Sequence, residues 1–235
     1  MITIRDLKHE FVIGKKNKKQ VIPVLNSVNL HIEEGEIVTI LGRSGSGKST
    51  LLNLISGYMK PTAGTIHILN QDVTNLSEGE WADFRLQHIG FIFQSFQLIP
   101  SMTAFQNVEL PLKMKGMEKT KRLAKVEETL EKVGLAEFAG FYPSELSGGQ
   151  QQRVGIARAL VGEPKIILAD EPTGSLDVET ENEFLTLIHQ LNQNEGITFL
   201  VITHDREVAK IGHRSVTIAN GTISESGGEK RAIQR

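Results

Sequence analysis

Residues 42–49 have the sequence Gly42-Arg43-Ser44-Gly45-Ser46-Gly47-Lys48-Ser49, which matches the pattern G-x-x-x-x-G-K-[ST] of a phosphate-binding loop. An apolar run from Ile37 to Leu41 precedes this loop, and the segment Thr50-Leu51-Leu52-Asn53-Leu54-Ile55 follows it. The first predicts a strand and the second a helix, which is the context that the motif requires. A Gly/Ser-rich surface turn before a helix is the alternative, and the recognisable strand and helix argue against it.

The residue types of this loop explain how it would hold a phosphate chain. Glycines let the backbone turn tightly and bring its N–H groups against the phosphates, next to the positive end of the helix. Lys48 would reach the β- and γ-phosphates, and the Ser49 hydroxyl would ligate Mg²⁺. We therefore predict a nucleotide site whose phosphate-binding residues are Gly42, Arg43, Ser44, Gly45, Ser46, Gly47, Lys48, Ser49 and Thr50.

Composition and charge limit the classes of partner. The 235 residues include 26 Lys and Arg against 28 Asp and Glu, a formal net charge of −2, which argues against broad attraction to nucleic acid or anionic lipid. We interpret the basic run Lys15-Lys16-Asn17-Lys18-Lys19 as a solvated hairpin tip, with a lipid or nucleic-acid contact as the alternative. The chain has no cysteine, consistent with a reducing cytoplasm. Because neither a signal peptide nor a membrane-spanning run is recognisable, we expect any membrane role to be peripheral.

Hydrophobic periodicity predicts an α/β fold with a helical insertion. The expected strands are Ile2 to Leu7, Val21 to Ile32, Ile37 to Leu41, Gly64 to Ile68, Ile89 to Phe93, Ile166 to Ala169 and Thr198 to Ile202. The last two are uninterrupted apolar runs, typical of buried parallel sheets. Helical periodicity dominates from about Gln94 to Val161, and Glu179 to Asn192 predicts a crossover helix.

These elements predict one domain over residues 1–223. Residues 1–93 and 163–223 would form the catalytic α/β core, a RecA-like parallel sheet of the P-loop NTPase class, together with an N-terminal antiparallel β subdomain. Residues 94–162 would form the inserted helical subdomain, and residues 224–235 a polar, disordered tail.

Two carboxylates follow the buried strand from Ile166 to Ala169. Asp170 and Glu171 would therefore lie at the carboxyl edge of the sheet, where phosphate-loop enzymes place Mg²⁺ and water. Asp170 is the candidate to hold Mg²⁺, and Glu171 is the candidate to polarise the attacking water. The alternative is that both acids merely cap a strand at a turn before Pro172.

The segment Leu146-Ser147-Gly148-Gly149-Gln150 resembles the signature motif of ATP-binding cassette (ABC) ATPases. The other motifs of that family follow in the expected order, and the resemblance extends from Ile2 to about Ile223. Phe11 matches the aromatic residue that stacks on adenine, Gln94 the Q-loop glutamine, Ser175-Leu176-Asp177 the D-loop and His204 the switch histidine. The resemblance implies ATP and Mg²⁺ as cofactors and ATP hydrolysis as the activity.

Several of these assignments have structural alternatives. Phe11 could be an ordinary core aromatic, Gln94 a polar strand end rather than an amide ligand of Mg²⁺, and His204 a satisfied histidine at the sheet edge rather than a donor to the γ-phosphate. By resemblance, the catalytic residues are Lys48, Glu171 and His204, and the Mg²⁺ ligands are Ser49, Gln94 and Asp170. Further nucleotide contacts are expected from Phe11, Gln94, Ser147, Gly149, Gln150 and Asp177.

The signature motif implies an assembly of two ATPase chains. A glycine-rich helix start at Ser147 is a ready anion site, and in the family this site faces the γ-phosphate of the ATP held by the partner subunit. Two chains related by a two-fold axis would complete two composite sites. The second chain could be an identical copy or a similar ATPase subunit.

The wording of the motifs resembles one branch of the family. Residues 146–153, LSGGQQQR, and residues 169–177, ADEPTGSLD, are similar to the MacB/LolD-type branch, and residues 93–100, FQSFQLIP, to YtrE-type ATPases. This implies a peripheral ATPase subunit on the inner face of the cell membrane that powers a separate permease, with export or mechanotransmission favoured over import. The alternatives are a regulatory ATPase acting on a membrane partner without transport, and a soluble ABC ATPase acting on DNA or ribosomes. The short span between Gln94 and Ser147 argues against the last, and we expect no nucleic-acid partner.

Overall fold

The computed structural model describes residues 1–14 and 19–225, and the chain divides into two compact units. The first unit contains Met1–Trp81 and the residues from Leu200 onward, and the second contains Ala82–Phe199. The expected boundaries at residues 94 and 162 both fall within the second unit. Lys15, Lys16, Asn17 and Lys18 of the predicted hairpin tip, and residues 226–235 of the predicted tail, lie outside the described residues.

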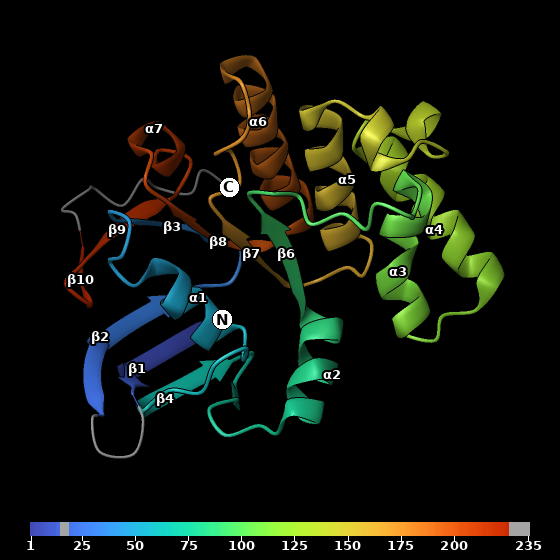
Figure 1. The fold of residues 1–235 in the computed structure, drawn as a ribbon. Helices are drawn as coiled ribbons and strands as arrows, with labels where there is room; N and C mark the ends of the chain where they lie inside the picture. The colour runs from blue at the N-terminus through green and yellow to red at the C-terminus, as the bar shows by residue number, and fades with distance from the viewer. Residues whose placement is uncertain (15–18, 226–235) are drawn as a thin grey trace. The chain divides into compact units, whose positions relative to one another are not determined.

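An antiparallel sheet with the order β2-β1-β4-β5 lies in the first unit (Figure 1). Its strands are β1 (Ile2–Ile13), β2 (Gln20–Ile32), β4 (Ala63–Ile68) and β5 (Gln71–Asp72). In register, Ile4 faces Leu30 of β2 and Ile66 of β4, and all three are buried. Strand β1 continues to Ile13, well beyond the predicted end at Leu7. The prediction stopped early because β-bulges interrupt the alternation of buried and exposed residues by which a strand is recognised.

The strand before the phosphate-binding loop belongs to a second sheet, in which the strands of this unit have the order β10-β9-β3. Strand β3 (Ile37–Leu41) pairs in parallel with β9 (Arg214–Ala219), which pairs antiparallel with β10 (Thr222–Glu225). The last two strands were not predicted, and β10 extends two residues into the expected polar tail. The first unit also contains α1 (Lys48–Ile55) and α7 (Arg206–Ala209).

The helical insertion and two parallel strands lie in the second unit. Strands β6 (Ile89–Phe93) and β7 (Ile166–Asp170) pair in parallel. The helices are α3 (Ala104–Met114), α4 (Lys119–Lys132), α5 (Gly148–Leu160) and α6 (Val178–Glu195), with short 3-10 turns at Ala136–Phe138 and Pro143–Glu145. Helix α5 packs against α3 and α4, as Figure 1 shows. Helix α2 (Glu78–His88) and strand β8 (Thr198–Thr203) each cross a division between the units.

Burial follows the predicted apolar runs. Ile166, Ile167, Leu168 and Ala169 of β7 are at most 1% exposed, and every residue of β8 is buried. Asp170 and His204, which follow these buried runs, therefore lie at a strand end beside the buried interior. Within residues 1–14 and 19–225, no helix has the length and hydropathy that would let it cross a lipid bilayer.

Candidate functional site

The loop from Gly42 to Gly47 joins β3 to α1 and needs glycine at two positions. A Cβ on Gly42 would lie 2.7 Å from the carbonyl oxygen of Ile218, so a side chain has no room there. Gly47 has φ +102°, and a Cβ on it would lie 2.9 Å from Leu25. The loop can therefore pass this close to β9 and β2 only with glycine at these two positions.

Lys48 lies buried at the start of α1, with 7% of its surface exposed. Its Nζ donates hydrogen bonds to the carbonyl oxygens of Gly42 at 2.8 Å and Arg43 at 3.2 Å. The ammonium group is thus held against the backbone of the loop, where it adds positive charge to the end of a helix.

The groups around the loop suit a phosphate chain. The Ser46 hydroxyl oxygen is buried and has no hydrogen-bond partner within the described residues. Helix α1 has Gly47 as its N-cap, without a side-chain cap, and no acidic residue in its first turn, so no side chain of that turn competes for its first N–H groups. Buried polar groups of this kind are normally bonded, and phosphate oxygens would supply the missing acceptor. Ser49, the residue after Lys48 in α1, is exposed.

Phe11 and His204 complete the predicted residues of the first unit. Phe11 is 40% exposed, and its ring meets that of His9 edge-on at 4.9 Å, so it is not the buried core aromatic of the alternative reading. His204 follows β8 and is exposed. The carbonyl oxygen of the preceding Thr203 accepts a hydrogen bond from the Gly42 N–H at 3.3 Å, which joins this strand end to the loop.

In the second unit, Asp170 ends β7, and Glu171 begins the turn that follows. Glu171 has φ +48°, a left-handed conformation that costs free energy for a residue with a side chain. Its carbonyl oxygen accepts from the Gly174 N–H at 3.1 Å, closing the turn. Both side chains are half-buried. A strained residue held at a strand end is common at catalytic sites.

Gln94 lies at the same strand edge as Asp170, because Phe93 and Asp170 are paired in register. The Ser175 hydroxyl donates to the Gln94 carbonyl oxygen at 2.6 Å. A Cβ on Gly174 would lie 2.5 Å from the Gln94 amide nitrogen, so the side chain of Gln94 occupies the space left by that glycine. The structure therefore brings the Q-loop glutamine against the turn that begins at Glu171, and the Ser175 contact was not predicted.

The loop after Gln94 is also bonded to the signature helix. Arg158 on α5 donates to the carbonyl oxygens of Phe96 at 2.9 Å and Gln97 at 2.6 Å. Phe96 and Gln97 both have positive φ, so this guanidinium holds a strained segment. Burial lowers the pKa of Arg158. The sequence gives no local sign of this contact, since its partners are 61 and 62 residues away.

The signature motif forms the start of α5. Ser147 is the N-cap, and its hydroxyl oxygen accepts from the Gln150 N–H at 3.3 Å while the Gln150 side chain accepts from the Ser147 N–H at 2.8 Å. This capping box fixes the helix start at the predicted residue. A Cβ on Gly149 would lie 2.7 Å from Thr180 of α6, so the glycine allows the two helices to approach.

Asp177 is the N-cap of α6. It accepts from the Thr180 N–H at 3.0 Å and the Thr180 hydroxyl at 2.8 Å, and these bonds hold the pKa of the Asp177 carboxyl below its ordinary value. Its role in this structure is to cap the helix. Through Thr180, this D-loop residue is joined to the glycine of the signature motif.

The predicted residues are thus divided between the two units. The first contains the phosphate-binding loop, Phe11 and His204, and the second contains Gln94, the two acids and the signature motif. Apart from Phe11, which lies within β1, these residues lie at or next to strand ends and helix starts. This combination defines the nucleotide-binding cassette of an ABC transporter, in which the phosphate loop and the signature motif belong to one chain.

Comparison with known proteins agrees with that class. Residues 25–174 match the ABC transporter family, and the chain belongs to it, as an ATP-binding and ATP-hydrolysing subunit. It is 59% identical to the ABC transporter ATP-binding protein YtrE of Bacillus subtilis (strain 168) over 223 residues, which cover 95% of this chain and 96% of that protein. The family resemblance, the fold class and the ATPase activity expected from the sequence are therefore confirmed.

Two further relatives carry different transport functions in their names. The chain is 45% identical to the macrolide export ATP-binding/permease protein MacB of Rhodopirellula baltica, over 96% of this chain and 33% of that protein. It is 47% identical to the methionine import ATP-binding protein MetN of Brucella abortus (strain 2308), over 86% of this chain and 55% of that protein. One of these names specifies export and the other import, so the two relatives differ in the direction of transport.

A solved structure has the same fold. It is a dimeric, post-hydrolysis state of the ATP-binding cassette MJ0796 bound to ADP and Pi, with 42% identity and a TM-score of 0.86, and the match covers 97% of this chain and all of that one.

Proposed function

We propose that this subunit binds and hydrolyses ATP as one half of an ATPase dimer and powers a separate membrane permease, in export or mechanotransmission. The observation that carries the proposal is the presence, in one chain, of a phosphate-binding loop and a signature motif at the capped start of α5. In that loop the buried hydroxyl of Ser46 has no partner among the residues that the structure describes. The loop and the motif are each a candidate anion site. In a two-fold dimer, the nucleotide held by the phosphate-binding loop of one chain would face the signature motif of the other.

The residues divide the chemistry between charge neutralisation and water activation. Lys48 and the loop N–H groups would neutralise the β- and γ-phosphates, His204 would donate to the γ-phosphate, and Phe11 would stack on adenine. Glu171 would accept a proton from the attacking water or align it for in-line attack. Hydrolysis then depends on positioning and electrostatics rather than on covalent chemistry.

The candidate ligands also suit Mg²⁺. Ser49, Gln94 and Asp170 offer a hydroxyl, an amide and a carboxylate oxygen, the hard donors that Mg²⁺ prefers, and one protein carboxylate together with phosphates and water is a common set. When bound, the ion would neutralise charge on the phosphates. The Ser175 hydroxyl bonds the backbone carbonyl oxygen of Gln94, and the Gln94 side chain lies over Gly174, which leaves room for it.

Two variants separate these roles. Glu171→Gln should lower the rate of hydrolysis by about a hundredfold or more while sparing ATP binding, because a general base contributes that much. Lys48→Ala should weaken ATP binding by about tenfold or more, since it removes charge-assisted hydrogen bonds. The measurements are turnover at saturating ATP and the Kd for a fluorescent ATP analogue. Equal loss of binding in both variants would contradict the assignment.

The membrane role is tested by the proteins that accompany the ATPase. Support for an export-type permease comes from the motif wording shared with the MacB/LolD-type branch and from the 45% identity to the macrolide export protein MacB. Tagged Glu171→Gln protein, purified from its native membrane with ATP and Mg²⁺, should recover an integral membrane protein. A large extracytoplasmic domain on that protein would support export or mechanotransmission, whereas an associated solute-binding lipoprotein would point to import. Recovery of ribosomes or nucleic acid alone would refute the membrane role.

A further inference from the structure

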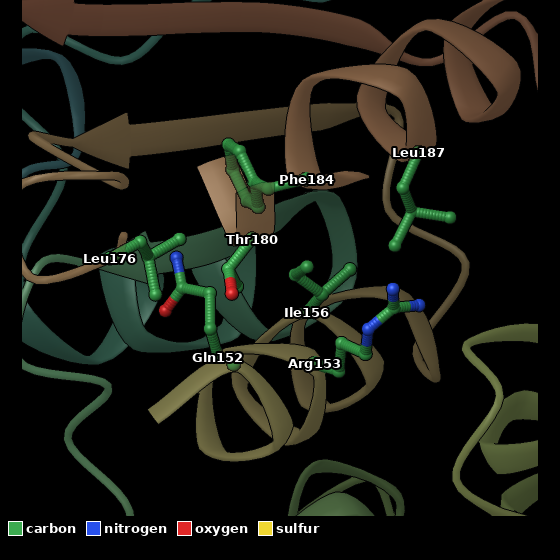
Figure 2. Close-up of a pocket in the computed structure, with 8 residues that line it drawn as sticks. Gln152, Arg153, Ile156, Leu176, Thr180, Phe184 and Leu187 are labelled. Carbon is green, nitrogen blue, oxygen red and sulfur yellow. The ribbon is translucent and has the colours of Figure 1, made fainter. Parts of the chain in front are cut away.

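One side chain of α5 reaches the carbonyl group of Pro172, the residue after Glu171. Gln152 is only 1% exposed, and its Nε2 donates to the carbonyl oxygen of Pro172 at 2.6 Å. Figure 2 shows the Gln152 side chain pointing from α5 toward Leu176 and Thr180. The signature helix is therefore bonded, about one turn from its start, to the residue next to the proposed general base.

The other end of the same amide has no partner. Gln152 Oε1 is buried and without a hydrogen bond in the described part of the chain. It lies in the lining of a cavity of about 10 Å³ that also includes Ile156, Leu176, Thr180, Phe184 and Leu187. An apolar side chain of similar length would remove this oxygen, but it would also leave the buried Pro172 carbonyl oxygen without its donor. The bond to Pro172 is therefore the contact that an apolar residue could not replace.

The turn that receives this bond needs support. Glu171 has φ +48°, and the next residue, Pro172, has no N–H with which to bond. The Gly174 N–H closes the turn on the Glu171 carbonyl oxygen at 3.1 Å. The Gln152 amide adds a bond from outside the turn, to the Pro172 carbonyl oxygen, which lies in sequence between Glu171 and Gly174. This bond restricts the backbone rotation that would redirect the Glu171 carboxylate.

We propose that Gln152 is a positioning residue, whose amide orients Glu171 and makes that orientation depend on the place of the signature helix. Ser147 starts the same helix, so a displacement of α5 on nucleotide contact would be passed to Pro172 through Gln152. The inference rests on the proposed roles of Glu171 and the signature motif.

Substitution by methionine separates positioning from stability. Gln152→Met keeps the length of the side chain and removes both the donor and the unsatisfied oxygen. We expect kcat to fall about tenfold with KM for ATP within twofold, and the melting temperature to fall no further than in a variant that removes a comparable buried donor elsewhere. Gln152→Leu serves as a second variant if the first repacks.

Asn192 provides the matched control. It is also buried, and its Nδ2 donates to the Ile197 carbonyl oxygen at 2.8 Å in the same unit, away from the turn after Glu171. Asn192→Leu should lower the melting temperature and leave kcat within twofold. If both variants lose stability and turnover in parallel, Gln152 is a structural residue and the proposal is wrong.

A double-mutant cycle with Glu171→Gln tests whether the effect passes through Glu171. Single-turnover hydrolysis is measured for the wild type, each single variant and the double variant. We expect Gln152→Met to slow the reaction about tenfold in the wild-type background and less than twofold in the Glu171→Gln background. An equal effect in both backgrounds, or normal kcat in Gln152→Met, overturns the positioning role alone. Full turnover in Glu171→Gln by itself instead refutes the proposed base, and the positioning role falls with it.

Discussion

At the scale of the residue, the Q-loop glutamine is held by two neighbours that carry no catalytic group. Ser175 bonds its carbonyl oxygen at 2.6 Å, and Gly174 leaves the space that its amide occupies. The distance of 2.5 Å between a Cβ on Gly174 and the Gln94 nitrogen means that the amide would have to move. A methyl group can therefore displace a proposed Mg²⁺ ligand without altering the ligand itself.

We accordingly expect Gly174→Ala to reproduce the effect of Gln94→Ala. Because the displaced atom is the end of an exposed, flexible side chain, the melting temperature should change little. Turnover should fall roughly ten- to a hundredfold, and half-maximal turnover should require more Mg²⁺, because a proposed ligand has moved. The measurement is a titration of ATP hydrolysis with Mg²⁺. Gly140→Ala, where a Cβ meets nothing within 4 Å, is the control and should behave as the wild type. An unchanged Mg²⁺ requirement in Gly174→Ala would show that the position of the Gln94 amide does not matter.

At the scale of the element, the hydrophobic patterns and motifs of the sequence predicted the bounds of two strands and the start of α5. The bounds of β3 and β6 match the apolar runs Ile37 to Leu41 and Ile89 to Phe93, since most residues of each run are buried. Strand β9 was missed because only Val216 and Ile218 of its six residues are buried, a pattern too short to stand out. The capped start of α5 was foreseen from the signature motif.

The contacts between elements were not predictable in the same way. Gln152 and Pro172 are 20 residues apart, and Ser175 and Gln94 are 81 apart. No propensity or period states which distant carbonyl oxygen a polar side chain will reach. A glutamine among the apolar positions of α5 is the one local signal, because a buried amide needs a partner.

The pairing of α3 with α4 leads to a pH prediction. Glu109 on α3 is 5% exposed and accepts hydrogen bonds from Arg122 of α4 and Lys113, both at 2.7 Å. Burial alone would raise the pKa of Glu109, but the bonds from Lys113 and Arg122 outweigh it, and the pKa is lowered. A carboxyl with a lowered folded pKa stabilises the fold above its unfolded pKa, and that contribution is lost as the pH falls through the folded value.

Glu109→Gln should therefore lower the free energy of unfolding by about 2–3 kcal/mol at pH 7, where hydrogen bonds to a charged group are lost. The difference from the wild type should shrink as the pH falls below about 4, because the wild-type carboxyl is then protonated as well. Urea unfolding at a series of pH values measures this. Glu127→Gln, at an exposed position of α4, is the control, and a difference for Glu109→Gln that does not depend on pH would contradict the ionic explanation.

At the scale of the whole molecule, one chain offers a phosphate loop and a signature motif, and the proposed dimer supplies each with its counterpart. The mass of 26.0 kDa should therefore double when ATP is bound and hydrolysis is blocked by Glu171→Gln. Light scattering after size exclusion measures this directly, with ADP as the control ligand. A strictly monomeric protein at high concentration with ATP would refute the homodimer and favour pairing with a similar sister subunit.

A charge placed at Ser147 tests the surface through which such a dimer would form. Aspartate is as good an N-cap as serine, so Ser147→Asp should preserve α5 and the melting temperature. It would also put a carboxylate where the γ-phosphate of the partner's ATP is expected, and like charges at short range repel by several kcal/mol in a water-poor interface. In the Glu171→Gln background we expect Ser147→Asp to abolish the ATP-dependent dimer while the Kd for ATP in the monomer stays within twofold. Ser147→Asn, a neutral cap of the same shape, should still dimerise; if it fails equally, the serine hydroxyl rather than the sign of the charge decides assembly.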